Sequence, residues 1–342
     1  MKKLRILSVV LAVVMLAAVC PVASAQGGSF GSYERVVIIG VDGAGAFFDD
    51  TDTPSCDRIF SENSAVTNDC RSEIPTISAQ NWGAILLGVT CDRHGLTNDT
   101  LDTVERDSSE KYPSVFRIAR ETYPDAVLAS FCDWSPINYG LIENDIGVYK
   151  ANANDEELTG LIEAYLPEND PKLMFVHFDS VDGAGHSNGY GSAEHLARLT
   201  VVDGFIGRVY DKLDSLGRID DTLFIVVADH GGTPGGSHGG ATSAEKTVFL
   251  GVKGKNVTSG TMENAEVRDV AAIALHALGC EQPEIMTSRV PAGVFADCPE
   301  TARPLGDSSL KQLMDIVAFL REYLPYITNI VFGILAGFSR TA

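Results

Sequence analysis

The sequence predicts a single α/β domain with a mostly parallel central sheet and helices on both faces. Apolar β-type runs alternate with helical patterns along the chain, which is typical of this fold class. Three of the runs stop at Asp or Asp-His, so their polar ends would lie at the carboxyl edge of a sheet, where α/β proteins build their sites. Without its first 25 residues the 342-residue chain retains 317, which suits one large domain.

Five runs rich in β-branched and aromatic residues are predicted to be strands. They are Arg35–Val41, Ala126–Phe131, Lys172–Phe178, Thr222–Ala228 and Thr247–Val252. Five other segments carry apolar residues at helical spacing. They are Ser78–Leu87, Ser114–Thr122, Glu156–Tyr165, Ala193–Leu216 and Val267–Leu278.

Residues 1–25 have the features of a secretory signal peptide. Lys2, Lys3 and Arg5 precede the apolar run Ile6–Val19, and Ala23-Ser24-Ala25 offers a small-residue cleavage site. The run is short for a membrane-spanning helix. We therefore expect cleavage of this leader and export to the cell envelope or the extracellular space.

The acidic composition argues against a nucleic-acid partner. Loss of the three basic residues of the leader takes the formal charge from −20 to −23, and a phosphate backbone would meet net repulsion. A phosphorylated small substrate stays compatible, because bound cations can reverse the local sign. Six cysteines remain, which permits disulfides in an exported chain; their spacing matches no zinc-knuckle pattern, and we interpret them as structural.

The chain changes character after Cys298. Residues 299–309 are polar and carry two prolines, which predicts a linker at the end of a domain of residues 26–298. In the helical tail, residues 310–342, the 17 residues Tyr323–Ser339 carry no charge. Two interpretations stay open: a C-terminal membrane anchor at the short limit for a bilayer span, or a terminal helix packed on the domain, which Pro325 and Asn329 favour.

Carboxylate and imidazole side chains follow the predicted strands in a pattern that suits two metal ions. Each has a plain structural alternative, since an Asp after a strand often caps the next helix and a glycine-rich loop can be simply flexible. Together they form a mixed oxygen and imidazole set that suits Zn²⁺ better than Mg²⁺ or Ca²⁺, and that Mn²⁺ or Fe would also accept. The predicted ligands are Asp42, Asp182, His186, Asp229, His230 and His238.

The spacing of these residues suggests how they would converge. Asp182 and His186 are separated by three residues, two of them glycine, so a loop or a single turn could direct both at one ion. Asp229 and His230 would diverge on a strand, but the two glycines that follow allow a bend. His238 lies in a loop so rich in glycine that we expect it to pack poorly.

The segment Glu73–Trp82 offers a hydroxyl nucleophile, Thr76 or Ser78. It lies at the start of a predicted helix, where free amide groups and the positive end of the helix dipole favour an anionic phosphate. A nearby divalent cation promotes a hydroxyl to its alkoxide. The alternative is that Thr76 and Ser78 only cap the helix, and we expect Thr76 to cap it in either case.

Taken in this order, the motifs resemble those of the alkaline phosphatase superfamily and, within it, the type I phosphodiesterase and nucleotide pyrophosphatase branch. The likeness runs from about Val36 to Val252 and implies an alkaline phosphatase-like fold. The nucleophile aligns with Ser78, because Asn81 stands three residues later, as in the family. The resemblance implies two divalent metal ions, one held by Asp42, Ser78, Asp229 and His230 and the other by Asp182, His186 and His238.

The resemblance also implies roles for other polar residues. In the family an asparagine after a His-Gly pair donates to a phosphate oxygen, and Asn98 is the matching residue, one position earlier than expected. Asp179 is expected to orient a ligand or a bound water, and Asp203 to be structural. The remaining histidines are interpreted as packing or surface residues: His94, His177, His195 and His276.

The expected activity is hydrolysis of phosphodiester or pyrophosphate bonds in a small phosphate ester or nucleotide, through a phospho-seryl intermediate on Ser78. A phosphomonoesterase and a phospho-group transferase acting on envelope lipids or polymers stay alternatives, because both use the same metal core. A sulfatase is disfavoured, since Ser78-Ala79-Gln80-Asn81-Trp82 lacks the Pro and Arg of that class. A non-catalytic exported binding protein would lack a ligand or the nucleophile, and none is missing.

Overall fold

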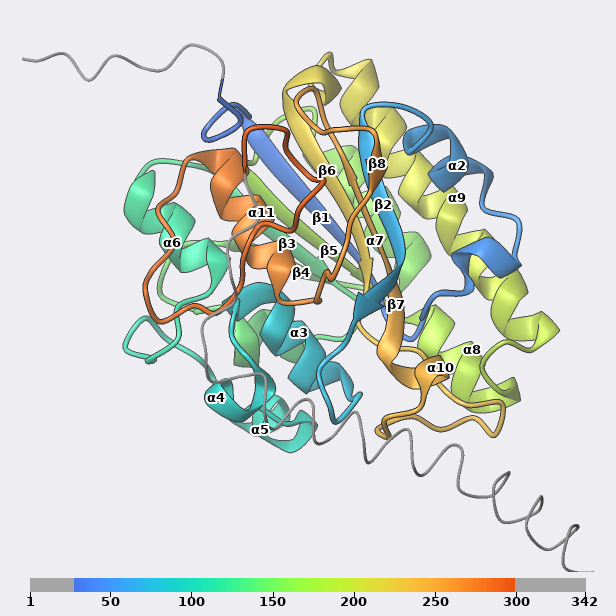
Figure 1. Ribbon diagram of the computed structural model, residues 1–342. Coiled ribbons are helices and arrows are strands. Elements are labelled where there is room, and N and C mark those ends of the chain that lie inside the picture. The colour runs from blue at the N-terminus through green and yellow to red at the C-terminus, as the bar shows by residue number, and fades with distance from the viewer. Residues whose placement is uncertain (1–27, 299–342) are drawn as a thin grey trace, which may run out of the picture.

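The computed structural model describes residues 28–298, which build an α/β domain around an eight-stranded sheet (Figure 1). The predicted signal peptide (1–25), linker (299–309) and tail (310–342) lie outside these residues. Within residues 28–298, we find no helix whose length and apolar character would let it cross a bilayer. No disulfide bond joins the six cysteines of residues 28–298.

The sheet is mostly parallel, as predicted. The strands are β1 (Arg35–Val41), β2 (Ser64–Arg71), β3 (Leu128–Cys132), β4 (Tyr149–Asn152), β5 (Leu173–Phe178), β6 (Thr222–Ala228), β7 (Thr247–Lys253) and β8 (Gly260–Thr261). Their order is β4-β3-β5-β1-β6-β7-β2-β8. Among these described strands, only β7 runs antiparallel to its neighbours, β6 and β2.

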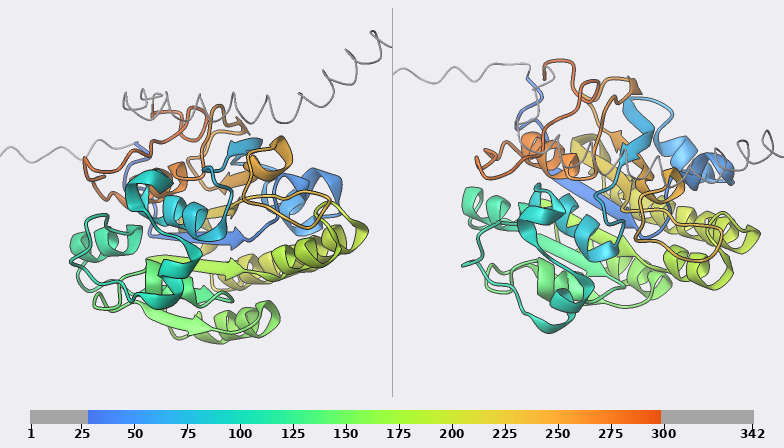
Figure 2. Two further views of the ribbon diagram at one scale, coloured as in Figure 1. Left: turned by 90° about the horizontal axis from the view of Figure 1, so that it is seen from below. Right: turned by 60° about the horizontal axis from the view of Figure 1, so that its bottom comes forward.

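Helices cover both faces of the sheet. The longer ones are α3 (Ser78–Leu87), α6 (Val115–Thr122), α7 (Asp155–Tyr165), α8 (Ser180–Asn188), α9 (Ala193–Ser215) and α11 (Asp269–Leu278). Shorter ones are α2 (Pro54–Ile59), α4 (Cys91–His94), α5 (Asn98–Thr103), α10 (Ser243–Lys246) and the π-helical turn η2 (Ile137–Leu141). Helix α11 packs with α3 and α6 on one face, and α9 packs with α2, α7 and α8 on the other side of the molecule (Figure 2).

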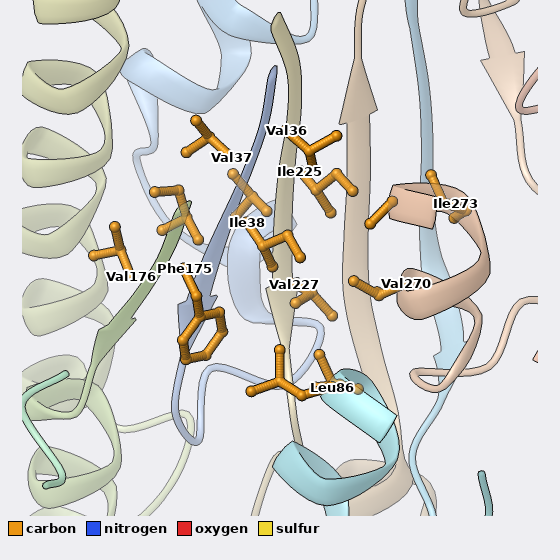
Figure 3. Close-up of a cluster of buried hydrophobic side chains, with 14 of the residues drawn as sticks. Val36, Val37, Ile38, Leu86, Phe175, Val176, Ile225, Val227, Val270 and Ile273 are labelled. Atoms are coloured by element: carbon orange, nitrogen blue, oxygen red, sulfur yellow. The ribbon is translucent and has the colours of Figure 1, made fainter. Parts of the chain in front are cut away.

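The central strands are buried on both faces. Every residue of β1, β5 and β6 is buried, which explains why these strands are continuous apolar runs rather than alternating ones. Figure 3 shows Ile225 and Val227 of β6 beside Val270 and Ile273 of α11, with Leu86 of α3 close by. Removal of such apolar surface from water, worth about 25 cal/mol per Å², holds the helices on the sheet.

All five predicted strands and all five predicted helices are present, with ends within two residues of the prediction. The sequence does not predict β2, β4 or the two-residue β8. Strand β2 is rich in polar residues, and its pairing with β7 shifts register between Thr67 and Cys70, so its apolar residues do not alternate. Strand β4 has four residues, none of them buried.

Candidate metal centre and nucleophile

Three parallel strands each deliver an aspartate to the same edge of the sheet. The last residues of β5 and β6 both pair in register with the last residue of β1. Asp42, Asp179 and Asp229 come next in the chain. Because the strands are adjacent and parallel, these three carboxylates lie side by side at the carboxyl edge.

A first pocket is formed by Asp42, Asp229 and His230, all of them buried. His230 Nε2 lies 3.4 Å from Asp42 Oδ1 and 3.4 Å from Asp229 Oδ2. One ligand atom from each residue lies within 4.8 Å of the others. This spacing suits three ligands of one ion.

The Asp42 carboxylate is oriented by two donors outside the pocket. Its Oδ2 accepts hydrogen bonds from Trp82 Nε1 at 2.9 Å and from His177 Nε2 at 3.0 Å. Both donors are fully buried, so the bonds are shielded from water. They leave Oδ1 facing the pocket.

One carboxylate oxygen of Asp229 accepts hydrogen bonds, and the other faces the pocket. Its Oδ1 accepts from the backbone amides of Gly43 at 3.1 Å and His230 at 2.8 Å. Its Oδ2 is buried, and no donor among residues 28–298 reaches it. A buried carboxylate oxygen without a donor is costly, and a bound cation would satisfy it.

A second pocket is formed by Asp182, His186 and His238. Asp182 and His186 lie on α8, with His186 Nε2 3.2 Å from Asp182 Oδ2. The predicted loop or single turn is therefore wrong, because the segment forms a nine-residue helix in which four-residue spacing puts both side chains on one face. His238 Nε2 lies 3.1 Å from His186 Nε2 and 4.0 Å from Asp182 Oδ1.

The three histidines of the two pockets are held through Nδ1. Because a carbonyl oxygen only accepts, Nδ1 carries the proton and Nε2 carries a lone pair. In the second pocket two such lone pairs face each other across 3.1 Å, an arrangement that a shared cation stabilises. The Nδ1 donors and carbonyl acceptors are His186 to Gly236 at 2.9 Å, His230 to Gly231 at 3.0 Å and His238 to Thr76 at 2.8 Å.

The two pockets adjoin, and their carboxylates are crowded together. The rings of His230 and His238 stack with centroids 4.0 Å apart. Burial, and then the charge of Asp182, raise the pKa of Asp42 to about 8. Burial, and then the charge of Asp42, raise the pKa of Asp229, while burial lowers the pKa of His230 to about 3. Crowded carboxylates beside neutral imidazoles fit divalent cations, which supply the missing positive charge.

Ser78 faces the first pocket. Its Oγ lies 3.2 Å from His230 Nε2 and 3.5 Å from Asp42 Oδ1. Ser78 is the first residue of α3 and is buried. The hydroxyl is therefore held at a helix N-terminus, with a base and a carboxylate beside it.

Thr76 does not cap α3, contrary to the prediction. The N-cap residue is Ile77, and it makes no side-chain cap. Thr76 Oγ1 instead donates to Gly240 O and accepts from Gly239 N, both at 3.0 Å. The buried Glu245 holds the same loop from the other side, accepting from Gly240 N at 2.7 Å. These hydrogen bonds anchor the glycine-rich loop that carries His238, although none of residues 234–240 is buried, as expected of a loop that packs poorly.

Other predicted residues lie where they can support the site. Asn98 Oδ1 accepts from the backbone amide of Ala79 at 3.1 Å, directly beside Ser78. Asp179 can share a cation-sized cluster with Asp42 and His177, and burial raises its pKa to about 7. Asp203 accepts from the backbone amides of Ser55 and Cys56 at 2.8 Å each, so it caps α2 and is structural.

His177 and Tyr190 are among the supporting residues that the sequence analysis misses. His177 lies inside the apolar run of β5, where a lone histidine is usually interpreted as packing. Its hydrogen bond to Asp42 becomes visible only when β5 is placed beside β1 in the sheet. Tyr190 lies in the loop after α8, and its Oη donates a hydrogen bond to Asp182 Oδ1 at 2.6 Å. Because Tyr190 lies beyond the end of the helix, helical spacing from Asp182 does not point to it.

The fold and the candidate site are those of the alkaline phosphatase-like superfamily, whose phosphoric ester hydrolases and transferases use divalent metals. The family model for type I phosphodiesterase / nucleotide pyrophosphatase matches residues 36–130 and 146–249. The chain belongs to this family, which confirms the resemblance drawn from its sequence.

Two of the curated relatives match about a third of the chain or less. GPI ethanolamine phosphate transferase 2 of Aspergillus fumigatus is 27% identical over 114 residues, which are 33% of this chain and 15% of the relative. The catalytic subunit of human GPI ethanolamine phosphate transferase 3 is 32% identical over 94 residues, 27% of this chain and 8% of the relative. The matched part of this chain is thus a small fraction of these relatives' length.

Solved structures share the fold. Inactive murine ectonucleotide pyrophosphatase/phosphodiesterase 5 in complex with AMP superposes with a TM-score of 0.60 at 13% identity, covering 73% of this chain and 96% of that one. The lipoteichoic acid synthase LtaP from Listeria monocytogenes gives a TM-score of 0.59 at 14% identity, covering 90% of this chain and 95% of that one. At these identities the likeness concerns the fold alone.

Proposed function

We propose that this protein is an exported two-metal hydrolase that cleaves phosphodiester or pyrophosphate bonds through a phospho-seryl intermediate on Ser78. One observation carries the proposal: the Ser78 hydroxyl lies against Asp42 and His230, beside a pocket whose ligand atoms converge within 4.8 Å. The second pocket adjoins it. A serine used only for capping would have no need of either.

The metal ions, when bound, supply Lewis-acid stabilisation of charge on the phosphate oxygens and on the serine oxygen. Asp42, Asp229 and His230 would hold the first ion, and Asp182, His186 and His238 the second. Three imidazoles beside carboxylates favour Zn²⁺, with Mn²⁺ or Fe as the other acceptable ions.

The side chains of the protein then account for the attack of Ser78 on phosphorus. The Ser78 proton leaves Oγ towards Asp42 Oδ1, which lies 3.5 Å away, because the Nε2 lone pair of His230 would be used as a metal ligand. The serine oxygen forms a bond to phosphorus while the ester bond to the leaving alcohol or phosphate breaks in line, and water later cleaves the phospho-serine. The N-terminus of α3 faces the transferred anion with its positive end.

Asn98 is the proposed substrate-binding residue. Its Oδ1 is occupied by the Ala79 amide, which leaves the Nδ2 donors of the same carboxamide free to turn towards a phosphate oxygen near Ser78. The register of Asn98, one position earlier than in the family pattern, is thus compatible with this role.

A transferase is the second proposed function. The specific support is that the matched relatives include GPI ethanolamine phosphate transferases and that LtaP, a lipoteichoic acid synthase, shares the fold. In such a reaction an alcohol, rather than water, would accept the phosphoryl group from Ser78. The ectonucleotide pyrophosphatase complex with AMP supports the nucleotide alternative.

Export is proposed from residues 1–25, whose basic start, apolar run and small-residue site have the order of a signal peptide. Residues 310–342 would then anchor the enzyme in the envelope or pack on its domain. Either arrangement would keep the catalytic domain outside the cytoplasm.

The test is a comparison of Ser78→Ala with the wild type on bis-p-nitrophenyl phosphate, p-nitrophenyl phosphate and a nucleotide p-nitrophenyl ester. We expect a preference for the diesters, loss of activity on chelation, recovery with Zn²⁺, and a fall of roughly 10³-fold or more in kcat for Ser78→Ala. Ser61→Ala, which removes an exposed hydroxyl bonded to Arg58 O, is the control. Substantial activity in Ser78→Ala would refute the mechanism, and transfer to added ethanolamine or glycerol in place of hydrolysis would favour the transferase.

A further inference from the structure

Tyr190 is a buried residue beside the second pocket and is not itself a candidate ligand. Its side chain is 2% exposed, and its Oη donates to Asp182 Oδ1 at 2.6 Å. The other oxygen, Asp182 Oδ2, lies 3.2 Å from His186 Nε2. The phenol thus occupies one carboxylate oxygen and leaves the other directed at the histidine ligand.

The Tyr190 ring packs closely against two glycines. A Cβ on Gly185 of α8 would lie 2.5 Å from the ring, and one on Gly232, after β6, would lie 2.2 Å from it. The ring therefore fits only because both positions are glycine. It also lies edge-on to His186, with centroids 5.8 Å apart, and to His238, at 6.1 Å.

Asp182 is held from its opposite side as well. A Cβ on Gly43, in the turn after β1, would lie 2.4 Å from Asp182 Oδ1. The carboxylate is therefore confined between the Gly43 backbone and the Tyr190 hydroxyl. Loss of the Tyr190 hydroxyl would remove the hydrogen bond that orients Asp182 Oδ1, because the Gly43 backbone makes only a packing contact with that oxygen.

We infer that Tyr190 is a positioning residue of the second pocket, which sets the affinity of that pocket for its cation by fixing the rotamer of Asp182. The inference rests on the proposed two-metal function and extends it. It assigns different supports to the two pockets: Trp82 and His177 act on Asp42, and Tyr190 acts on Asp182.

The test is calorimetric titration of Zn²⁺ into chelator-stripped wild type, Tyr190→Phe and Tyr123→Phe. Tyr190→Phe keeps the ring between the two glycines and removes only the hydroxyl. We expect two binding events in the wild type, and in Tyr190→Phe one of them weakened about 10- to 100-fold with the other within about twofold. Tyr123→Phe is the matched control, because its Oη also donates at 2.6 Å, to Leu278 O away from the site, and both of its affinities should match the wild type.

Unchanged Zn²⁺ affinities in Tyr190→Phe, or a parallel fall in both, would overturn the inference. If Tyr190→Phe does not fold, Gly185→Ala serves instead, since its Cβ displaces the ring with the hydroxyl intact and should give the same selective loss. A wild type that binds fewer than two Zn²⁺ would refute the two-metal function itself. That result comes from the wild type alone, so the two failures can be told apart.

Discussion

Removing the metal ions should make folding stability fall as pH rises from 6.5 to 8. The perturbation is chelation, which leaves the buried carboxylates of the two pockets without a cation. Burial and the charge of Asp182 raise the pKa of Asp42 from 3.8 to about 8 in the folded chain. An acid whose folded pKa is raised stabilises the fold below its unfolded pKa, and this contribution is lost as pH rises through the folded pKa.

Above pH 6.5 the buried carboxylates outweigh the buried histidines. The histidines act in the opposite sense, because in the unfolded chain they lose their remaining protons as the pH rises from 6.5. Burial lowers the pKa of His94 to about 4 and that of His230 to about 3, and it also lowers the pKa of His177, His195 and His276; each regains only about 0.4 kcal/mol between pH 6.5 and 8. Asp229 and Asp133, whose pKa burial raises, add to the loss from Asp42. Between pH 6.5 and 8, folded Asp42 keeps a proton that the unfolded chain has lost. At 1.36 kcal/mol per pH unit, Asp42 alone costs on the order of 2 kcal/mol, or about 5 °C in Tm. Asp179, whose pKa burial raises to about 7, adds in the same direction.

Urea unfolding followed by circular dichroism, at pH 6.5 and pH 8, measures the effect in chelated and Zn²⁺-loaded protein. The loaded protein should not lose stability over this range, because the cation replaces the proton and ligand deprotonation favours binding. Asp42→Asn is the matched control: its amide stays neutral, so the chelated variant should show a smaller pH dependence and exceed the chelated wild type at pH 8. A chelated wild type that is as stable at pH 8 as at pH 6.5 would refute this account of the site.

Two further substitutions test the support around Asp42. His177→Phe keeps a ring in β5 but removes the donor to Asp42 Oδ2; we expect Zn²⁺ affinity at the first pocket to fall about 10- to 100-fold by calorimetry, and an unchanged titration would exclude this role for His177. Gly40→Ala would place a Cβ 2.3 Å from the ring of Trp82, and because that indole is fully buried and bonded to Asp42, we expect the free energy of unfolding to fall by about 1–3 kcal/mol in urea. A Gly40→Ala protein as stable as the wild type would mean that the indole can move.

The parts of the fold that sequence predicts best are those whose residues are buried on both faces. Strands β1 and β6 are continuous apolar runs that end at an aspartate, and their predicted bounds match the structure. The convergence of Asp42, Asp229 and His230 follows from those ends, since adjacent parallel strands end at one edge. Segment 180–188 is harder, because two glycines in its middle lower its helix propensity; its helix is stabilised by packing against α9 and by close approach of Gly185 to Tyr190.

The supporting contacts are beyond sequence reasoning for a physical reason. His177 reaches Asp42 from the neighbouring strand, 135 residues away in the chain, and Thr76 reaches the His238 loop across 163. Such bonds depend on sheet order and register, which set the distance between elements and are not encoded in either segment alone. In the sequence, the only local sign of such a hydrogen bond is a polar residue within an apolar run.

A single backbone position, Gly43, lies against both pockets. Gly43, at φ +66, donates its amide to Asp229 Oδ1 at 3.1 Å in the first pocket, and its α-carbon leaves no room for a side chain beside Asp182 in the second. Its carbonyl accepts from the buried His195 Nε2 at 3.2 Å. A residue with a side chain would meet Asp182 and would resist the positive φ, so glycine is what allows both carboxylates to approach the same turn. The resulting crowding of negative charge lowers the stability of the metal-free fold, as expected of a site organised for cations rather than for packing.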